Sequence, residues 1–116
     1  MLAGNLMDGL PHDRTDTEMF DHLLSLPGVR IERIVSTGQA SPPDFWYDQP
    51  QGEWVALVAG EARLRIDGEA DARHLRVGDW LNLPARCRHR VDWTHPDAAT
   101  IWLAVHYDVG HTEGIG

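Results

Sequence analysis

Residues 53–60 read Glu-Trp-Val-Ala-Leu-Val-Ala-Gly, and residues 78–89 read Gly-Asp-Trp-Leu-Asn-Leu-Pro-Ala-Arg-Cys-Arg-His. Each segment predicts a short strand that is bounded by turn-forming residues. Successive side chains of a strand point to opposite faces, so Glu53 shares a face with Val55 and Leu57. The first segment therefore carries a carboxylate on an otherwise apolar face.

The second segment places His89 on an inward face by the same alternation. His89 groups with Val91 and Trp93, whereas the opposite face carries three arginines, namely Arg86, Arg88 and Arg90. Unpaired guanidinium groups are too costly to bury, so the arginine face must meet water or carboxylates. An imidazole and a carboxylate on inner faces need partners, and we expect Glu53 and His89 to face one cavity together.

The rest of the chain predicts one helix followed by a series of strands. Thr15-Asp16-Thr17-Glu18 has the spacing of a helix capping box. Four apolar residues then fall on one side of a helix of about ten residues, and Pro27-Gly28 would end it. They are Met19, Phe20, Leu23 and Leu24. From residue 29 onwards the apolar period changes to two, and Asp67-Gly68 predicts a hairpin turn. Many short strands at close spacing predict an all-β sandwich or barrel.

Length and composition limit the possible classes of protein. A chain of 116 residues is long enough for one domain only. We expect a flexible arm over residues 1–14, the β domain with its leading helix over residues 15–109, and a tail over residues 110–116. A formal net charge of −8 argues against nucleic-acid binding. The absence of lysine from the sequence excludes a lysine Schiff base and a P-loop.

Cysteine content and hydropathy indicate a reducing compartment. Cys87 is the single cysteine, so an internal disulfide is impossible, and a small buried apolar side chain is its default role. No stretch of the sequence approaches 18 apolar residues, and the first residues carry no basic cluster. We expect a cytoplasmic protein that does not bind membranes.

The two segments together resemble the two signature motifs of the cupin superfamily. Glu53, six residues and Gly60 resemble the end of the first motif, and Gly78, five residues, Pro84 and then His89 resemble the second. The resemblance covers about residues 36–107. It implies a double-stranded β-helix, also called a jelly-roll barrel, here with a short N-terminal helix, and it implies a homodimer.

The same resemblance implies a metal site that this chain carries only in part. Cupins usually bind a divalent ion through two histidines of the first motif, its Glu, and the histidine of the second. Glu53 and His89 match, but the positions of the two missing histidines hold Trp46 and Asp48 on one count and Tyr47 and Gln49 on the other. Asp48 or Gln49 could add an oxygen ligand for Zn²⁺, Mn²⁺ or Fe²⁺. His74 and His106 are possible substitutes; His74 is expected to face solvent, and the direction of His106 stays open.

Five tryptophans are more than one small barrel can enclose, so some must line a pocket or pack across an interface. We assign Tyr47 and Trp93 to the pocket wall, beside Glu53 and His89. Trp54 and Trp102 are the candidates for a subunit interface, because their strands are apolar on both sides.

Three functions are compatible with this sequence. The first is a binding protein that holds a small polar ligand between Glu53, His89, Gln49 and Tyr47. The second is an enzyme of the same fold, either metal-dependent and similar to dioxygenases or decarboxylases, or an isomerase in which Glu53 and His89 form a general acid–base pair. The third is a non-catalytic dimerisation module. A fold alone does not decide among them.

Overall fold

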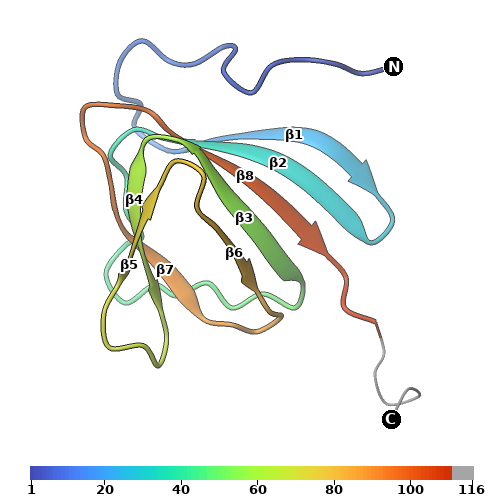
Figure 1. Cartoon of the computed structure of the whole chain (residues 1–116), viewed down its shortest axis with the longest axis vertical. Coiled ribbons are helices and arrows are strands. Elements are labelled where there is room, and N and C mark those ends of the chain that lie inside the picture. The colour runs from blue at the N-terminus through green and yellow to red at the C-terminus, as the bar shows by residue number, and fades with distance from the viewer. Residues whose placement is uncertain (111–116) are drawn as a thin grey trace.

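The computed structural model describes residues 1–110, and these form an all-β domain (Figure 1). Its eight strands are β1 (Met19–Leu26), β2 (Val29–Ser36), β3 (Gly52–Ala59), β4 (Glu61–Ile66), β5 (Arg73–Arg76), β6 (Trp80–Leu83), β7 (His89–Thr94) and β8 (Thr100–Tyr107). No helix long and apolar enough to cross a membrane occurs within residues 1–110. The tail expected from residue 110 lies, from residue 111 on, outside the described residues.

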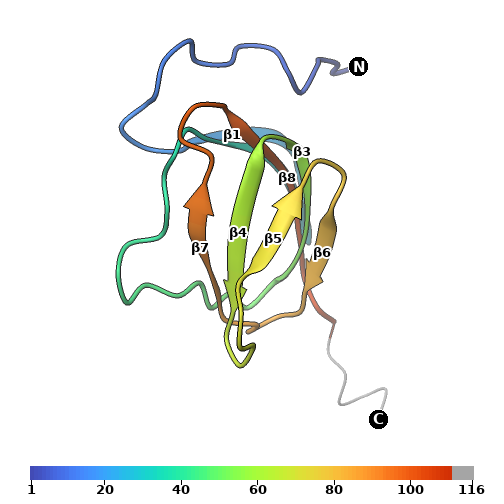
Figure 2. The same cartoon turned by 60° about the vertical axis from the view of Figure 1, so that its left-hand side comes forward.

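The strands form two antiparallel sheets that face each other (Figure 2). The larger sheet has the order β1-β2-β8-β3-β6, and the smaller has the order β5-β4-β7. Strands distant in sequence are therefore neighbours, as in the jelly-roll barrel that the sequence predicts.

The core lies between the two sheets, and the predicted alternation of β3 is confirmed. Glu53, Val55 and Leu57 are all buried, whereas the residues between them are only partly covered. The inner face of β8 contributes Trp102 and Ala104, and Trp102 Nε1 donates a hydrogen bond of 3.0 Å to Ser36 Oγ. Burial of these apolar side chains is the main source of stability for the domain.

The predicted N-terminal helix is wrong, because residues 19–26 form strand β1. This strand pairs with β2 from Met19 opposite Val35 to Leu26 opposite Val29, with a bulge between His22 and Leu24. The bulge explains why the apolar residues imitate a helical period, since one extra residue shifts the alternation of the strand. Pro27-Gly28 makes a two-residue turn rather than a helix end, and Gly28 has a φ of 83°.

The capping-box residues serve a loop instead of a helix. Thr15 Oγ1 donates to Thr17 O over 2.6 Å, and Thr15 N donates to Thr37 Oγ1 over 2.9 Å. The preceding arm lies across the outside of the large sheet (Figure 1). Arg33 is buried there and donates to the carbonyl oxygens of Leu6 and Asp8 over 3.0 and 2.5 Å.

Candidate functional site

The structure brings Glu53 and His89 together between the two sheets. Glu53 lies at the beginning of β3 and His89 at the beginning of β7, and both are buried, at 8% and 6% exposure. Glu53 Oε1 lies 3.6 Å from His89 Nε2, slightly beyond hydrogen-bond length and within ion-pair range. Two residues 36 positions apart in the sequence thus form one acid–base pair.

A backbone contact orients the His89 ring toward Glu53. The Cys87 carbonyl oxygen lies 2.8 Å from His89 Nδ1, and because a carbonyl only accepts, Nδ1 carries the proton. Burial by itself lowers the pKa of His89, but the Glu53 carboxylate and the Cys87 carbonyl oppose this, and the net pKa is raised above its ordinary value. The pair therefore favours a protonated imidazole against a carboxylate.

Tyr47 lies against His89 and also lines the cavity next to the pair. Its ring stacks on the His89 ring with a centroid separation of 5.3 Å and an interplanar angle of 21°. The two residues also exchange backbone hydrogen bonds of 2.7 and 3.1 Å. Burial first, then the carboxylates of Glu18 and Glu53, raise the pKa of Tyr47. The phenol thus stays protonated at neutral pH and can donate to a ligand.

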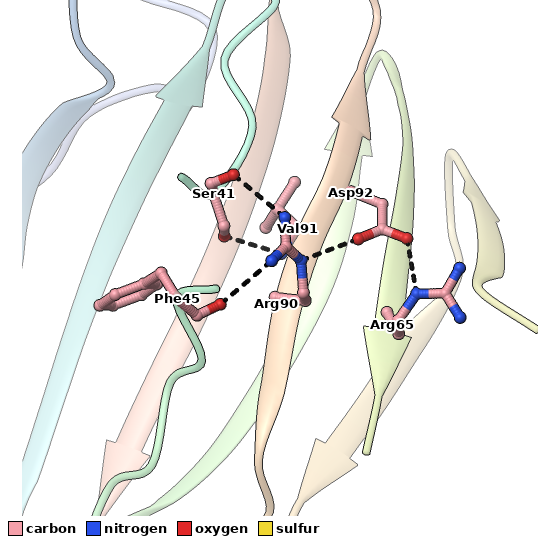
Figure 3. Close-up of polar contacts among 6 residues, drawn as sticks. All are labelled: Ser41, Phe45, Arg65, Arg90, Val91 and Asp92. Carbon is pink, nitrogen blue, oxygen red and sulfur yellow. Dashed lines mark hydrogen bonds and ion pairs between the residues drawn. The ribbon is translucent and has the colours of Figure 1, made fainter. Parts of the chain in front are cut away.

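An arginine clamp holds the loop that carries Tyr47 against β7 (Figure 3). Arg90 donates to Asp92 Oδ1 over 3.0 Å, and to the carbonyl oxygens of Ser41 and Phe45 over 3.2 and 3.5 Å. Asp92 also accepts from Arg65 Nε over 2.8 Å. Arg90 therefore does pair with carboxylate and carbonyl oxygen on the outer face, as the alternation of β7 predicts.

A cavity of 140 Å³ opens beside the Glu53–His89 pair. Its apolar wall comes from both sheets and comprises Phe20, Ile34, Val55, Leu64, Leu83, Val91 and Trp102. Its polar wall comprises Glu18, Arg30, Glu32, Tyr47, Gln49, Glu53, His89 and His106. An apolar surface with a few polar groups is typical of a small-molecule site.

Glu32 and His106 form a second buried pair in this cavity, which the sequence reasoning missed. His106 Nε2 lies 3.0 Å from Glu32 Oε1. His106 points inward because it shares the inner face of β8 with Trp102 and Ala104, and it lies directly opposite Glu53 of β3. The strand period of two puts Glu32 on the same face as Ile34, but only the pairing of β2 with β8 brings this carboxylate to His106.

Two residues assigned to the site lie elsewhere. Asp48 turns outward, where its Oδ1 lies 3.5 Å from Arg86 Nη1 and both side chains are about half exposed or more. Trp93 does not line the cavity; a bulge in the pairing of β4 with β7 turns it outward, so that it meets Arg63 at 5.4 Å. The assignment of Trp93 to the pocket wall is therefore wrong, because the bulge reverses the alternation after Val91.

Trp102 was expected at an interface, and this assignment is also wrong. It is 4% exposed and lines the cavity from within the core. Trp54 behaves differently. It lies on the outer face of the large sheet and stacks on Trp80, with ring centroids 6.0 Å apart.

The residues present do not fit the metal site that the resemblance implies. Within residues 1–110 no three side chains of the His, Cys, Asp and Glu types converge as a metal-binding group. At the positions where histidines would be needed, Trp46 packs against Arg88 and Tyr47 stacks on His89. Gln49 lines the cavity but is a weak neutral donor.

Comparison with known proteins identifies similar structures. The chain is 50% identical to a Ralstonia eutropha JMP134 protein whose crystal structure is named "putative mannose-6-phosphate isomerase", over 94% of this chain and 100% of that one, with a TM-score of 0.91. No known family model matches the sequence, and no curated protein matches it.

Two more distant structures resemble the fold alone. A cupin superfamily protein of Desulfitobacterium hafniense DCB-2 is 15% identical over 94% of each chain, with a TM-score of 0.73. An RmlC-like cupin of Desulfovibrio desulfuricans is 17% identical over 94% of this chain and 99% of that one, with a TM-score of 0.68.

Proposed function

This chain belongs to the cupin superfamily, and on that premise we propose that its barrel binds a small polar ligand against Glu53 and His89. The observation that carries this proposal is the buried Glu53–His89 pair at 3.6 Å, which opens into a cavity of 140 Å³. One water needs only about 10–15 Å³ of such space, so this cavity has room for a small organic molecule. Tyr47 and Gln49 supply further hydrogen-bonding groups.

The charges around the cavity favour a ligand that exchanges protons or hydrogen bonds with the pair. Within residues 1–110 the Glu53 carboxylate has no partner at hydrogen-bond length and only the longer contact with His89 at 3.6 Å, so its oxygens remain available to a ligand. A buried polar group of this kind costs stability unless something satisfies it, and proteins keep such groups at functional sites.

A second candidate function is the isomerisation of a small sugar. It is favoured by the raised pKa of His89 beside a carboxylate, because the pair then offers one group that can donate a proton and one that can accept it. The Ralstonia eutropha relative carries the name of a sugar-phosphate isomerase. Isomerisation of this kind moves a proton between neighbouring carbons, so deuterium from D₂O should enter mannose 6-phosphate at C2, as NMR would show. A wild-type protein that exchanges no more deuterium than the Glu53→Gln variant is not an isomerase of this sugar.

Thermal unfolding with a panel of sugars, sugar phosphates and keto acids tests ligand binding. A ligand at about 100 times its Kd stabilises the folded state by about 2.7 kcal/mol. We expect such a shift for wild-type protein and its loss in Glu53→Gln and His89→Gln. His74→Gln is the matched control, because His74 contacts Glu61 on the surface. A shift that survives both site variants would overturn the proposal. Metal analysis of the purified protein tests the metal-dependent alternative separately.

We further propose that the chain forms a homodimer through the outer face of the large sheet. The support is the stacked pair Trp54–Trp80, of which Trp80 is 61% exposed. An exposed indole of this size is typical of protein interfaces.

A further inference from the structure

We infer that Arg30 and His106 form a hydroxyl-binding subsite, so that the ligand of the cavity is a compound with neighbouring hydroxyl groups. This inference rests on the proposed ligand-binding function and names the chemical class of the ligand. It starts from the two buried side-chain nitrogens in residues 1–110 that have no hydrogen-bond partner, Arg30 Nε and His106 Nδ1. Both residues line the same cavity.

The two nitrogens come from directly opposed residues. Arg30 of β2 is the register partner of His106 of β8. Side chains opposed in this way on antiparallel strands have Cβ atoms about 4.5–5.5 Å apart. Buried polar groups without partners are rare, so two of them on one cavity wall need a common explanation.

The contact with Glu32 determines which ring nitrogen of His106 carries a proton. A carboxylate accepts, so His106 Nε2 donates its proton to Glu32 Oε1 over 3.0 Å. In the neutral ring Nδ1 then carries a lone pair and no proton. A proton on Nδ1 would add a second unpaired buried donor to that of Arg30 Nε. His106 therefore presents an acceptor.

Arg30 presents the complementary group. Its Nε always carries a hydrogen, and the nearest carboxylate oxygen, Glu32 Oε2, lies 3.8 Å away, beyond hydrogen-bond length. The two opposed residues thus carry one unpaired donor and one unpaired acceptor. A hydroxyl group satisfies both, because it accepts from Arg30 Nε and donates to His106 Nδ1. A carboxylate ligand would satisfy only Arg30, and its charge would oppose both the His106 lone pair and Glu32.

Strand β3, on the other side of β8 from β2, adds a second subsite beside the first. His106 lies opposite Glu53 in the pairing of β8 with β3, and strands are about 4.7–4.9 Å apart. One small molecule can therefore place one hydroxyl at Arg30 and His106 and a neighbouring oxygen at Glu53 and His89. This arrangement selects polyols and sugars over simple carboxylic acids.

Nitrogen-15 NMR of the histidine rings tests the inference on the wild-type protein. We expect His106 to carry its proton on Nε2 and none on Nδ1. D-Fructose and D-mannose, used as probes, should shift the resonances of both His106 and His89, whereas glutarate should leave His106 unchanged. Arg30→Leu and His106→Leu should each weaken binding of the sugar probe about tenfold, the loss expected for one hydrogen bond of about 1.4 kcal/mol. His74→Leu is the control.

The outcomes separate this inference from the proposed function. Sugar probes that shift neither histidine refute the hydroxyl subsite, whereas the thermal-unfolding panel, which includes keto acids, decides separately whether the cavity binds a ligand at all. Probes that shift His89 but not His106, or that bind Arg30→Leu as tightly as wild type, refute the hydroxyl subsite alone. A proton on Nδ1 of His106 refutes it as well, and this measurement needs no variant to fold.

Discussion

Replacement of Gly60 by alanine tests why the first motif ends in glycine. Gly60 joins β3 to β4 and so links the two sheets, and its φ is 82°. A Cβ at this position would lie 2.5 Å from Thr100 Cα and 2.7 Å from Ala99 O. Both are backbone atoms of a segment that cannot move freely, because Thr100 is fully buried at the beginning of β8.

Two costs add in the Gly60→Ala variant. A left-handed conformation costs a residue with a Cβ about 1–2 kcal/mol, and forced overpacking costs about 1–3 kcal/mol more. The free energy of unfolding should therefore fall by about 2–5 kcal/mol. Displacement of Thr100 would also disturb its hydrogen bonds with Glu61, of 3.2 and 3.3 Å.

Gly68 provides the matched control. Its φ is 92°, but nothing lies within 4 Å of the Cβ that alanine would add. Gly68→Ala should lose only the conformational cost, about 1–2 kcal/mol. Urea unfolding followed by tryptophan fluorescence measures both variants. An equal loss of stability in the two variants would refute the steric argument.

Three further changes have defined outcomes. The pKa of folded His89 is raised, so this group stabilises the protein at pH values below its unfolded pKa of about 6.5, and the contribution disappears as pH rises through the folded pKa. Glu53→Gln leaves only the Cys87 carbonyl to oppose the effect of burial and so lowers the pKa of His89. Wild type should therefore exceed this variant in unfolding free energy by more at pH 6 than at pH 9; an equal difference contradicts the pairing. Arg90→Lys keeps the charge but cannot bridge Asp92 and the Ser41 carbonyl together, so the free energy of unfolding should fall by about 1–2 kcal/mol and amide exchange at Tyr47 should be faster. Arg88→Lys is the control: the carboxylate that Arg88 contacts is that of Asp67, and this substitution should change little. Trp80→Ser should change the free energy of unfolding by no more than about 0.5 kcal/mol and should convert the proposed dimer into a monomer in analytical ultracentrifugation. A dimer that persists in this variant would exclude the outer face of the large sheet as the dimer interface.

Local patterns in the sequence predict the inward direction of Glu53 and His89 correctly. Each residue lies in a strand where the period of two is regular up to that position, so alternation alone decides the face. The turn at Asp67-Gly68 is local in the same sense, and Gly68 indeed has a positive φ. The family resemblance then joins the two strands into one barrel.

Alternation fails wherever a strand contains an extra residue. The bulge between His22 and Leu24 makes an amphipathic strand resemble a helix, and the bulge before Trp93 turns that ring away from the cavity. A bulge depends on the partner strand, since it exists only as a mismatch between two registers. The sequence of one strand does not contain that information.

The sequence by itself determined that this chain is a β protein with a carboxylate and an imidazole on inner faces, because these features follow from the local period of the backbone. Only the tertiary structure decided what surrounds them. Glu32 and His106 are 74 residues apart and meet because β2 pairs with β8, and Arg30 faces His106 through the same register. Contacts of this kind depend on which strands become neighbours, and packing of the whole barrel sets that order.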